Sequence, residues 1–181
     1  MMRLNDIFKN TSYDDTLFSE GAIVAVESAI FMKPIKGVET PYIKCLVREK
    51  EIKLTPEEAV RQLYIYKLIH EYGYPTDRIQ LETPIHFGRE VKRADITIMD
   101  KDRPTVPYII VELKKPKLTD GKEQLKSYCN ATGAPIGVWT NGEQVSCYNR
   151  KDPNFFEMIS DIPKANQKLS DILSERYTYD D

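Results

Sequence analysis

Three charged side chains lie near the ends of two consecutive β-prone segments, and their types suit metal-assisted chemistry. Asp95 stands near the start of segment 94–99, while Glu112 and Lys114 stand at the end of segment 108–114. Side chains alternate along a strand, so Glu112 and Lys114 face the same side of a sheet. Asp95 joins them if the two strands pair. Two carboxylates at the end of an apolar strand are costly unless a cation compensates their charge.

The donor atoms of this group predict both the cation and the reaction. Carboxylate oxygens are hard ligands, which favours Mg²⁺, with Mn²⁺ as a substitute, over Zn²⁺. Lys114 would orient a water molecule while the metal draws charge from a phosphate, and together they would promote hydrolysis of a phosphodiester. The same residues could instead form only a solvated ion pair at a strand end. That alternative predicts no binding of divalent metal.

A helix is predicted immediately before these strands. Segment 54–58 (LTPEE) combines a threonine that can cap, a proline at the first helical position and a T-x-x-E capping box. Apolar residues then recur at three- and four-residue steps to about Tyr72, and Gly73 and Pro75 end the pattern. Such an amphipathic helix packs one face on a sheet.

Turn residues separate the β-prone runs that follow this helix. We expect strands at 79–87, 94–99 and 108–114, a helix at 121–131, a strand at 135–140, a turn at Asn141-Gly142 and a strand at 144–148. The third strand begins as a continuous apolar run, which is typical of a central strand covered on both faces. The order predicts an α/β fold with a central mixed β-sheet flanked by helices, built on an α-β-β-β-α-β core.

The chain divides into one core and two accessory segments. Residues 54–150 form the predicted core, and residues 1–53 form an N-terminal subregion of short elements packed on it. Residues 151–181 are predicted to be a peripheral acidic tail, or a linker to a missing C-terminal domain, with one helical candidate near 164–173.

Length and composition restrict the class of protein. The 181 residues suit one domain, and 41% hydrophobic residues with a mean hydropathy of −0.48 indicate a globular chain rather than a disordered or membrane one. A net charge of −2 argues against general affinity for polyanions, so contact with nucleic acid must be local. The three cysteines show no C-x-x-C spacing, and the sequence has no signal peptide or membrane-spanning run. These features predict a cytoplasmic protein without a membrane partner.

Six short motifs occur in a consistent order along the chain: 54–58 (LTPEE), 60–62 (VRQ), 93–95 (RAD), 111–114 (VELK), Gln124-x-x-x-Tyr128 and 140–142 (TNG). Together they resemble the N-terminal nuclease domain of the restriction (R) subunit of type I restriction enzymes, within the PD-(D/E)xK nuclease superfamily. The resemblance covers residues 54–150. Ala94 stands where the superfamily name has proline, but the aspartate that follows it is present.

The resemblance implies a restriction-endonuclease-like fold and a magnesium-dependent endonuclease. Asp95 and Glu112 would then be metal ligands, the backbone carbonyl of Leu113 a third ligand, and Lys114 the catalytic lysine. Members often add a glutamate from the first helix, and Glu58 matches it by position. The capping box explains Glu58 without any metal, so both interpretations remain open.

Four further residues are candidates for DNA binding or support. Gln124 and Tyr128 share a helix face, which suits contact with DNA or bracing of Lys114, although Tyr128 could simply pack on the sheet. Lys115 and Arg93 could belong to a phosphate-binding rim, and a solvated surface explains them equally well.

The resemblance also implies partners. These are double-stranded DNA, specificity and methyltransferase subunits or fused domains, and an ATP-driven translocase in the full polypeptide. No phosphate-binding loop motif occurs in this sequence, so ATP would act only through a separate domain outside this chain. The alternative function is a catalytically silent DNA-binding or subunit-docking module with the same fold, and the intact Asp95, Glu112 and Lys114 argue against it.

Overall fold

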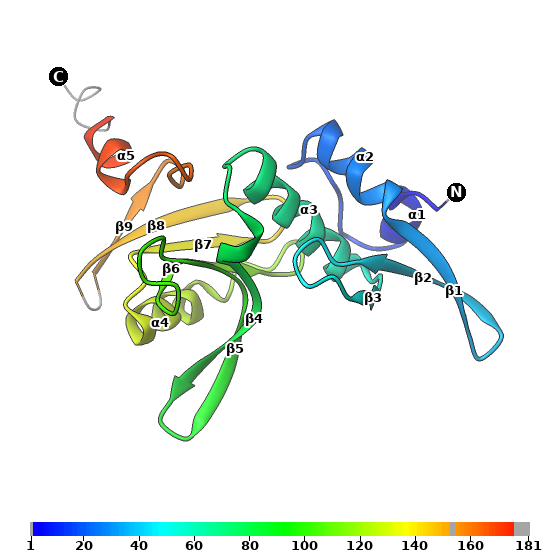
Figure 1. The fold of residues 1–181 in the computed structure, drawn as a ribbon, viewed down its shortest axis with the longest axis horizontal. Helices are drawn as coiled ribbons and strands as arrows, with labels where there is room; N and C mark the ends of the chain where they lie inside the picture. Colours follow the sequence, from blue (N-terminus) through cyan, green and yellow to red (C-terminus); the bar gives the residue numbers. More distant parts are fainter. Residues whose placement is uncertain (1, 153–154, 176–181) are drawn as a thin grey trace.

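A six-stranded mixed β-sheet forms the centre of the molecule (Figure 1). The computed structural model describes residues 2–152 and 155–175. In sheet order the strands are β4 (Ile79–Phe87), β5 (Glu90–Met99), β6 (Pro107–Leu113), β7 (Ile136–Thr140), β8 (Val145–Asp152) and β9 (Phe155–Ile159). Strands β6 and β7 run parallel, and the other neighbouring pairs are antiparallel. The prediction of an α/β fold with a central mixed sheet is confirmed.

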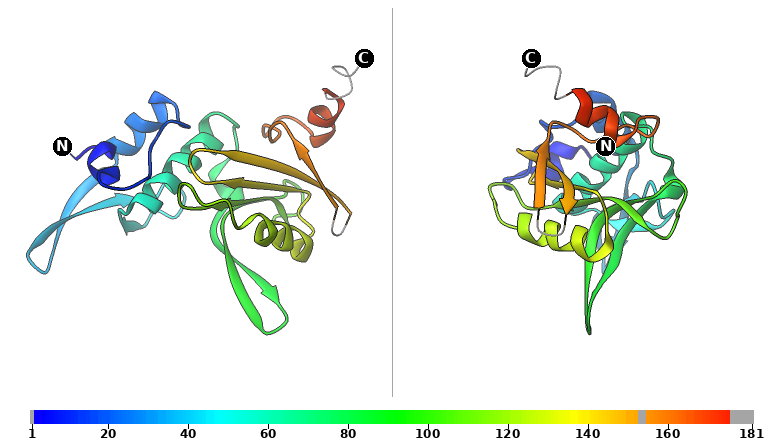
Figure 2. Two further views of the ribbon diagram at one scale, coloured as in Figure 1. Left: turned by 180° about the vertical axis from the view of Figure 1, so that it is seen from behind. Right: turned by 90° about the vertical axis from the view of Figure 1, so that its left-hand side faces the viewer.

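Two helices cover opposite faces of this sheet. Helix α3 (Pro56–His70) packs on one face, where its buried side chains share a core with Ile96 and Val111. Helix α4 (Lys122–Thr132) packs on the other face against Ile110 and the fully buried Trp139 (Figure 2). The continuous apolar run of β6 is therefore buried on both faces, as expected for a central strand.

Helix α3 begins where the sequence predicts it. The Thr55 hydroxyl accepts a hydrogen bond from the backbone N–H of Glu58 at 3.2 Å, and Pro56 is the first helical residue. The Glu58 carboxylate, however, bonds to Arg61 and Gln62 further along the helix. The threonine cap thus forms, while the Glu58 side chain is directed to other partners.

The N-terminal segment forms its own small layer beside α3. It contains helices α1 (Leu4–Phe8) and α2 (Glu20–Ser28) and a three-stranded sheet of β1 (Ile30–Ile35), β2 (Val38–Lys44) and β3 (Glu51–Lys53). Buried side chains of both helices, including Leu4 and Val26, belong to the same core cluster as α3. No helix among the described residues is long and apolar enough to cross a membrane.

The segment that follows β8 differs from the expected peripheral tail. Its residues 155–159 form β9, which pairs with β8 as the sixth strand and buries Ile159. The helix expected near 164–173 is α5 (Leu169–Glu175). Apolar side chains within an acidic segment therefore complete the edge of the sheet. The alternative prediction, that 151–181 links to a further C-terminal domain, concerns the end of the chain, of which 176–181 lie outside the described residues.

Candidate active site

Asp95 and Glu112 lie opposite each other where strands β5 and β6 separate. The last registered pair of these strands is Ile96 with Val111, and the next positions along are the two carboxylates. The backbone N–H of Asp95 donates to Glu112 Oε1 at 3.2 Å, and the N–H of Leu113 donates to Asp95 Oδ2 at 2.8 Å. Each carboxylate thus takes the place of a ladder carbonyl on the neighbouring strand, which fixes both side chains against the sheet.

Burial disfavours ionisation of this pair. Glu112 is only 4% exposed, and burial together with the nearby negative charge of Asp95 raises the pKa of Glu112 to about 8. Burial also raises the pKa of Asp95, although the Leu113 N–H and the positive charges of Arg61 and Lys114 oppose that effect. Two carboxylates in this state lack a sufficient counter-charge, and a bound cation would supply it.

The donor set fits a hard divalent cation. Among the described residues, no hydrogen-bond donor reaches the second carboxylate oxygen of either Asp95 or Glu112. The described residues contain no group of three or more His, Cys, Asp or Glu side chains that could hold a metal by themselves. Mg²⁺ commonly uses one or two carboxylates and keeps several water or phosphate ligands, so two carboxylates and the Leu113 carbonyl suit it.

Lys114 lies immediately after β6, beside the carboxylates. Its N–H donates to the Thr140 carbonyl at 2.8 Å, and its Nζ donates to Gln124 Oε1 at 3.1 Å. Gln124 projects from the first turns of α4, so the helix holds the lysine ammonium in place. Gln124 therefore braces Lys114, which was one of the two roles considered for it.

The loop between Lys114 and α4 is fixed by residues of β7 and the turn after it. Trp139 donates its indole N–H to the Asp120 carbonyl at 2.8 Å, and the Asn141 amide donates to the Leu118 carbonyl at 2.9 Å. Gly121, the residue before α4, has a φ of +92°, and a Cβ there would overlap Cε of Lys114. Glycine at position 121 therefore leaves the space through which the Lys114 side chain passes.

Replacing Gly121 with alanine is expected to displace Lys114 and reduce catalysis. Because of the positive φ and the overlap, we expect a loss of about 1–2 kcal/mol in the free energy of unfolding and at least about a tenfold loss of DNA cleavage. Gly133→Ala is the matched control, since Gly133 has a φ of +80° at the other end of α4 with open space around it. The control should lose comparable stability and keep its activity. Equal activity losses in both variants would contradict the assigned role of Gly121.

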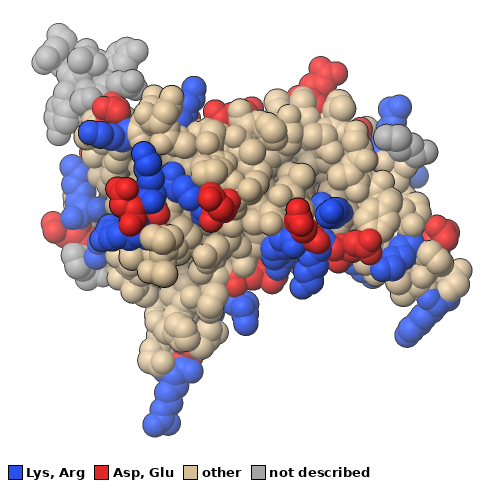
Figure 3. Space-filling model, viewed as in Figure 1, with Lys and Arg blue, Asp and Glu red and all other residues tan. Residues whose placement is uncertain are grey.

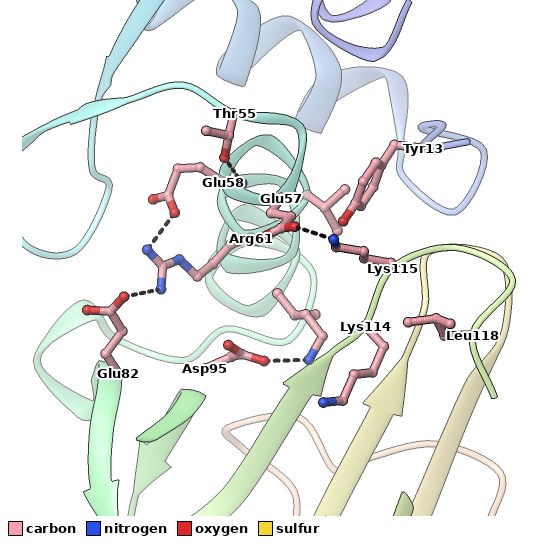
Figure 4. A pocket seen from close by; sticks show the side chains of 12 residues that line it. Tyr13, Thr55, Glu57, Glu58, Arg61, Glu82, Asp95, Lys114, Lys115 and Leu118 are labelled. Atoms are coloured by element: carbon pink, nitrogen blue, oxygen red, sulfur yellow. Dashed lines mark hydrogen bonds and ion pairs between the residues drawn. The ribbon is translucent and has the colours of Figure 1, made fainter. Parts of the chain in front are cut away.

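Asp95, Leu113 and Lys114 line a pocket of about 480 Å³ (Figure 4), whereas the buried Glu112 is not among its lining residues. The pocket is lined by Tyr13, Thr55, Glu57, Glu58, Val60, Arg61, Glu82, Asp95, Leu113, Lys114, Lys115 and Leu118. These residues come from the N-terminal segment, the start of α3, the β4–β5 pair and the end of β6. Tyr13 gives residues 1–53 a direct place in the site, which the sequence did not indicate.

Glu58 lines the pocket, but its carboxylate already bonds to other side chains of α3. Its carboxylate forms an ion pair with Arg61 and accepts a hydrogen bond from Gln62 Nε2 at 3.0 Å. Arg61 also approaches Glu82, with Nη1 to Oε1 at 3.5 Å. The V-R-Q motif that precedes the middle of α3 thus serves to hold carboxylates on the wall facing Asp95.

The remaining predicted residues lie around this centre with different exposure. Lys115 is exposed and pairs with Glu57 at 3.7 Å, and Arg93 is exposed and donates to the Glu82 carbonyl at 3.2 Å. Tyr128 is 2% exposed and packs against Phe87, with ring centroids 5.9 Å apart. Tyr128 therefore supports the sheet from α4 instead of presenting a surface for DNA.

Sequence reasoning missed the roles of Arg61, Glu82 and Gly121. Arg61 belongs to the V-R-Q motif. A charged residue on the buried face of an amphipathic helix is the sequence signal that could have indicated its role. Glu82 has a φ of +51° in the middle of β4, and its local sequence gives no sign of this. Gly121 could have been singled out only as the glycine before a predicted helix.

A model of the family described as type I restriction enzyme R protein N terminus matches residues 56–163, which is more than half of the chain. A comparison with curated proteins gives no match. Among solved structures, a protein from Anabaena variabilis described as a candidate nuclease of DUF820 is similar, with 17% sequence identity and a TM-score of 0.40. That alignment covers 71% of this chain and 82% of the other.

The family match includes α3 through β9, which hold Asp95, Glu112 and Lys114, but not the N-terminal segment that contributes Tyr13. The match supports a nuclease-like domain. The chain belongs to the family of type I restriction enzyme R protein N-terminal domains.

Proposed function

We propose that this chain is a Mg²⁺-dependent endodeoxyribonuclease domain that hydrolyses phosphodiester bonds in double-stranded DNA. The observation that carries the proposal is the reciprocal pair of Asp95 and Glu112 at the fork of β5 and β6, with the Lys114 ammonium braced beside it. Buried carboxylates with raised pKa next to a fixed cationic side chain are typical of catalytic sites.

Asp95, Glu112 and the Leu113 carbonyl would hold the cation. Their hard oxygen donors suit Mg²⁺, and Mn²⁺ can replace it because it accepts the same ligands. When bound, the ion would withdraw charge from a phosphate oxygen and lower the pKa of a coordinated water. The hydrogen bonds from the Leu113 and Asp95 N–H groups keep one oxygen of each carboxylate fixed, so the other oxygen remains directed for binding.

Lys114 would act on the attacking water and on the charge that develops at phosphorus. Its Nζ has three protons, and Gln124 takes only one of them in the structure. The other protons can orient the water and stabilise the negative charge of the transition state. Gln124 would therefore act through Lys114, by restricting the lysine to one position.

Contact with DNA would be local to the site. Figure 3 shows basic and acidic side chains mixed on the visible face, without a continuous basic stripe, in keeping with the net charge of −2. Lys115 and Arg93 are exposed near the pocket and could contact backbone phosphates on either side of the cleaved bond. Such contacts carry little sequence information, so target choice would depend on other parts of the restriction enzyme.

Family membership supports a multi-subunit setting for this domain. We infer that a specificity subunit selects the DNA, that a methyltransferase subunit or fused domain modifies it, and that an ATP-driven translocase in the same polypeptide controls cleavage. The domain would supply the hydrolytic step in this assembly, and its isolated activity would be weak and poorly selective.

Supercoiled plasmid DNA tests the proposed activity directly. We expect the domain to nick and then linearise plasmid in Mg²⁺ or Mn²⁺, and to stop when EDTA is added. Gel electrophoresis over time measures the conversion of supercoiled to open and linear forms. DNA binding in a gel-shift assay without cleavage under any divalent cation would instead support the catalytically silent docking module.

A further inference from the structure

We propose that Arg61 is a built-in cation of the pocket, which occupies the acidic wall formed by Glu58 and Glu82 so that the site binds one divalent metal ion instead of two. The inference rests on the proposed function, because it concerns the same metal site at Asp95 and Glu112. It assigns a purpose to the buried arginine of the V-R-Q motif, which the catalytic scheme does not use.

Arg61 lies beside the carboxylates of Glu58 and Glu82, where a second metal ion would otherwise neutralise their negative charge. Its side chain is 10% exposed and that of Glu58 is 8% exposed, and the two form an ion pair within the first turns of α3. The second guanidinium arm lies 3.5 Å from Glu82 Oε1. In Figure 4 the guanidinium lies between these two carboxylates, above Asp95. The buried Arg61 therefore pairs with both Glu58 and Glu82.

Glu58 is held on both sides, which keeps it with Arg61. Gln62 Nε2 donates to Glu58 Oε1 at 3.0 Å, and Gln62 itself is fully buried. The Gln62 side-chain oxygen accepts the backbone N–H of Leu46 at 3.1 Å, so the loop after β2 fixes the amide. Moving Glu58 to a metal at Asp95 would break two buried interactions, and each broken interaction would leave a buried polar group without its partner.

Glu82 is brought to the same wall by an unusual backbone. Glu82 on β4 lies opposite Asp95 on β5, between the paired residues Leu81–Ile96 and Thr83–Ala94. The φ angle of Glu82 is +51°. Non-glycine residues adopt this conformation at a cost, and such positions concentrate at functional sites. Arg93 donates to the Glu82 carbonyl at 3.2 Å, and Arg48 Nη1 lies 3.3 Å from its carboxylate.

Stability alone gives no reason for a buried arginine at position 61. The Arg61 Nε is buried and has no hydrogen-bond partner among the described residues. Apolar side chains often replace buried ion pairs without loss of stability. The charge of Arg61 is instead explained by the two carboxylates that it pairs with in the pocket.

Two-metal sites need further carboxylates near the first metal, with the ions about 3.5–4 Å apart. Without Arg61, the Glu58 carboxylate on the pocket wall would lose its ion pair and could supply such oxygens beside Asp95, while Glu82 would keep its ion pair with Arg48. Because the guanidinium is bound to both, the second set of donors is occupied. The arginine therefore decides how many ions the pocket holds.

Calorimetric titration of Mn²⁺ counts the ions. We expect one Mn²⁺ per wild-type domain, one in Arg61→Lys, which keeps the charge, and two in Arg61→Met. The double variant Arg61→Met with Glu58→Gln should return to one, because the second site would need the Glu58 carboxylate. Circular dichroism confirms that each variant is folded. Two ions in the wild type, or a single ion in folded Arg61→Met, would overturn the proposal.

Glu58→Gln alone provides a measurement that does not depend on the folding of the Arg61 variants. If Glu58 stays with Arg61, this change should leave Mn²⁺ affinity within about threefold of wild type, because it removes no ligand. A loss of tenfold or more would show that Glu58 ligates the metal and would overturn the proposal. Failure of the proposed function gives a different result, in which the wild-type domain binds no Mn²⁺ at all.

Discussion

Replacing Lys114 with methionine is expected to lower the rate of plasmid cleavage about 100- to 1,000-fold, the usual effect of removing one preorganised donor from a transition state. Methionine keeps much of the apolar length of the lysine and removes the ammonium that Gln124 fixes. The binding affinity for Mn²⁺ should stay close to wild type, because Lys114 is not a ligand. Initial rates of nicking at saturating metal measure the effect.

Lys101→Met is a matched control for this variant. Lys101 is an exposed lysine in the turn after β5 and does not line the pocket. Its loss changes the net charge by the same amount without touching the pocket, so cleavage should be unaffected. A similar loss of activity in both variants would mean that overall charge matters, and would remove the argument for a catalytic lysine.

Glu112→Gln should have two opposite effects, a loss of metal binding and a gain in stability at alkaline pH. The pKa of Glu112 is raised from its ordinary value of 4.5 to about 8 in the folded protein. Between these values the folded state holds a proton that the unfolded state releases, so the free energy of unfolding falls as pH rises. Glutamine mimics the protonated acid and avoids this loss.

We therefore expect metal-free Glu112→Gln to be more stable than wild type by about 1–3 kcal/mol at pH 8, with the difference shrinking towards pH 5. Its Mn²⁺ affinity should fall more than about 100-fold, because a charged ligand is lost. Urea denaturation in EDTA at the two pH values measures the first effect, and calorimetry measures the second. A variant less stable than wild type at pH 8 would contradict the raised pKa of Glu112 in the metal-free protein.

Much of the site follows from local sequence patterns. Side-chain alternation placed Glu112 and Lys114 at one strand end, and two adjacent β-prone runs made pairing with the Asp95 strand the simplest arrangement. The four-residue spacing of Gln124 and Tyr128 put both on one face of α4, where Gln124 braces Lys114 and Tyr128 packs on the sheet. These features depend on residue spacing within one strand or one helix, which can be read from the sequence.

Other features depend on contacts between distant segments. The role of Arg61 requires Glu82, which lies 21 residues away and reaches the pocket only because β4 adopts a positive φ there. Strand β9 lies within the acidic segment 151–181, for which the sequence predicts a peripheral tail, but the edge of β8 pairs with its residues. The contribution of Tyr13 to the pocket likewise depends on how the N-terminal layer packs beside α3.

Titration of Mn²⁺ into the wild-type domain and into Asp95→Ala tests the central claim most directly. Asp95 is a ligand in this account and also accepts the Leu113 N–H, so circular dichroism must first show that the variant keeps the native fold. The account predicts saturable binding by the wild type and its loss in folded Asp95→Ala. Equal binding by both proteins, or no binding by folded wild type, would contradict a metal site at the fork of β5 and β6.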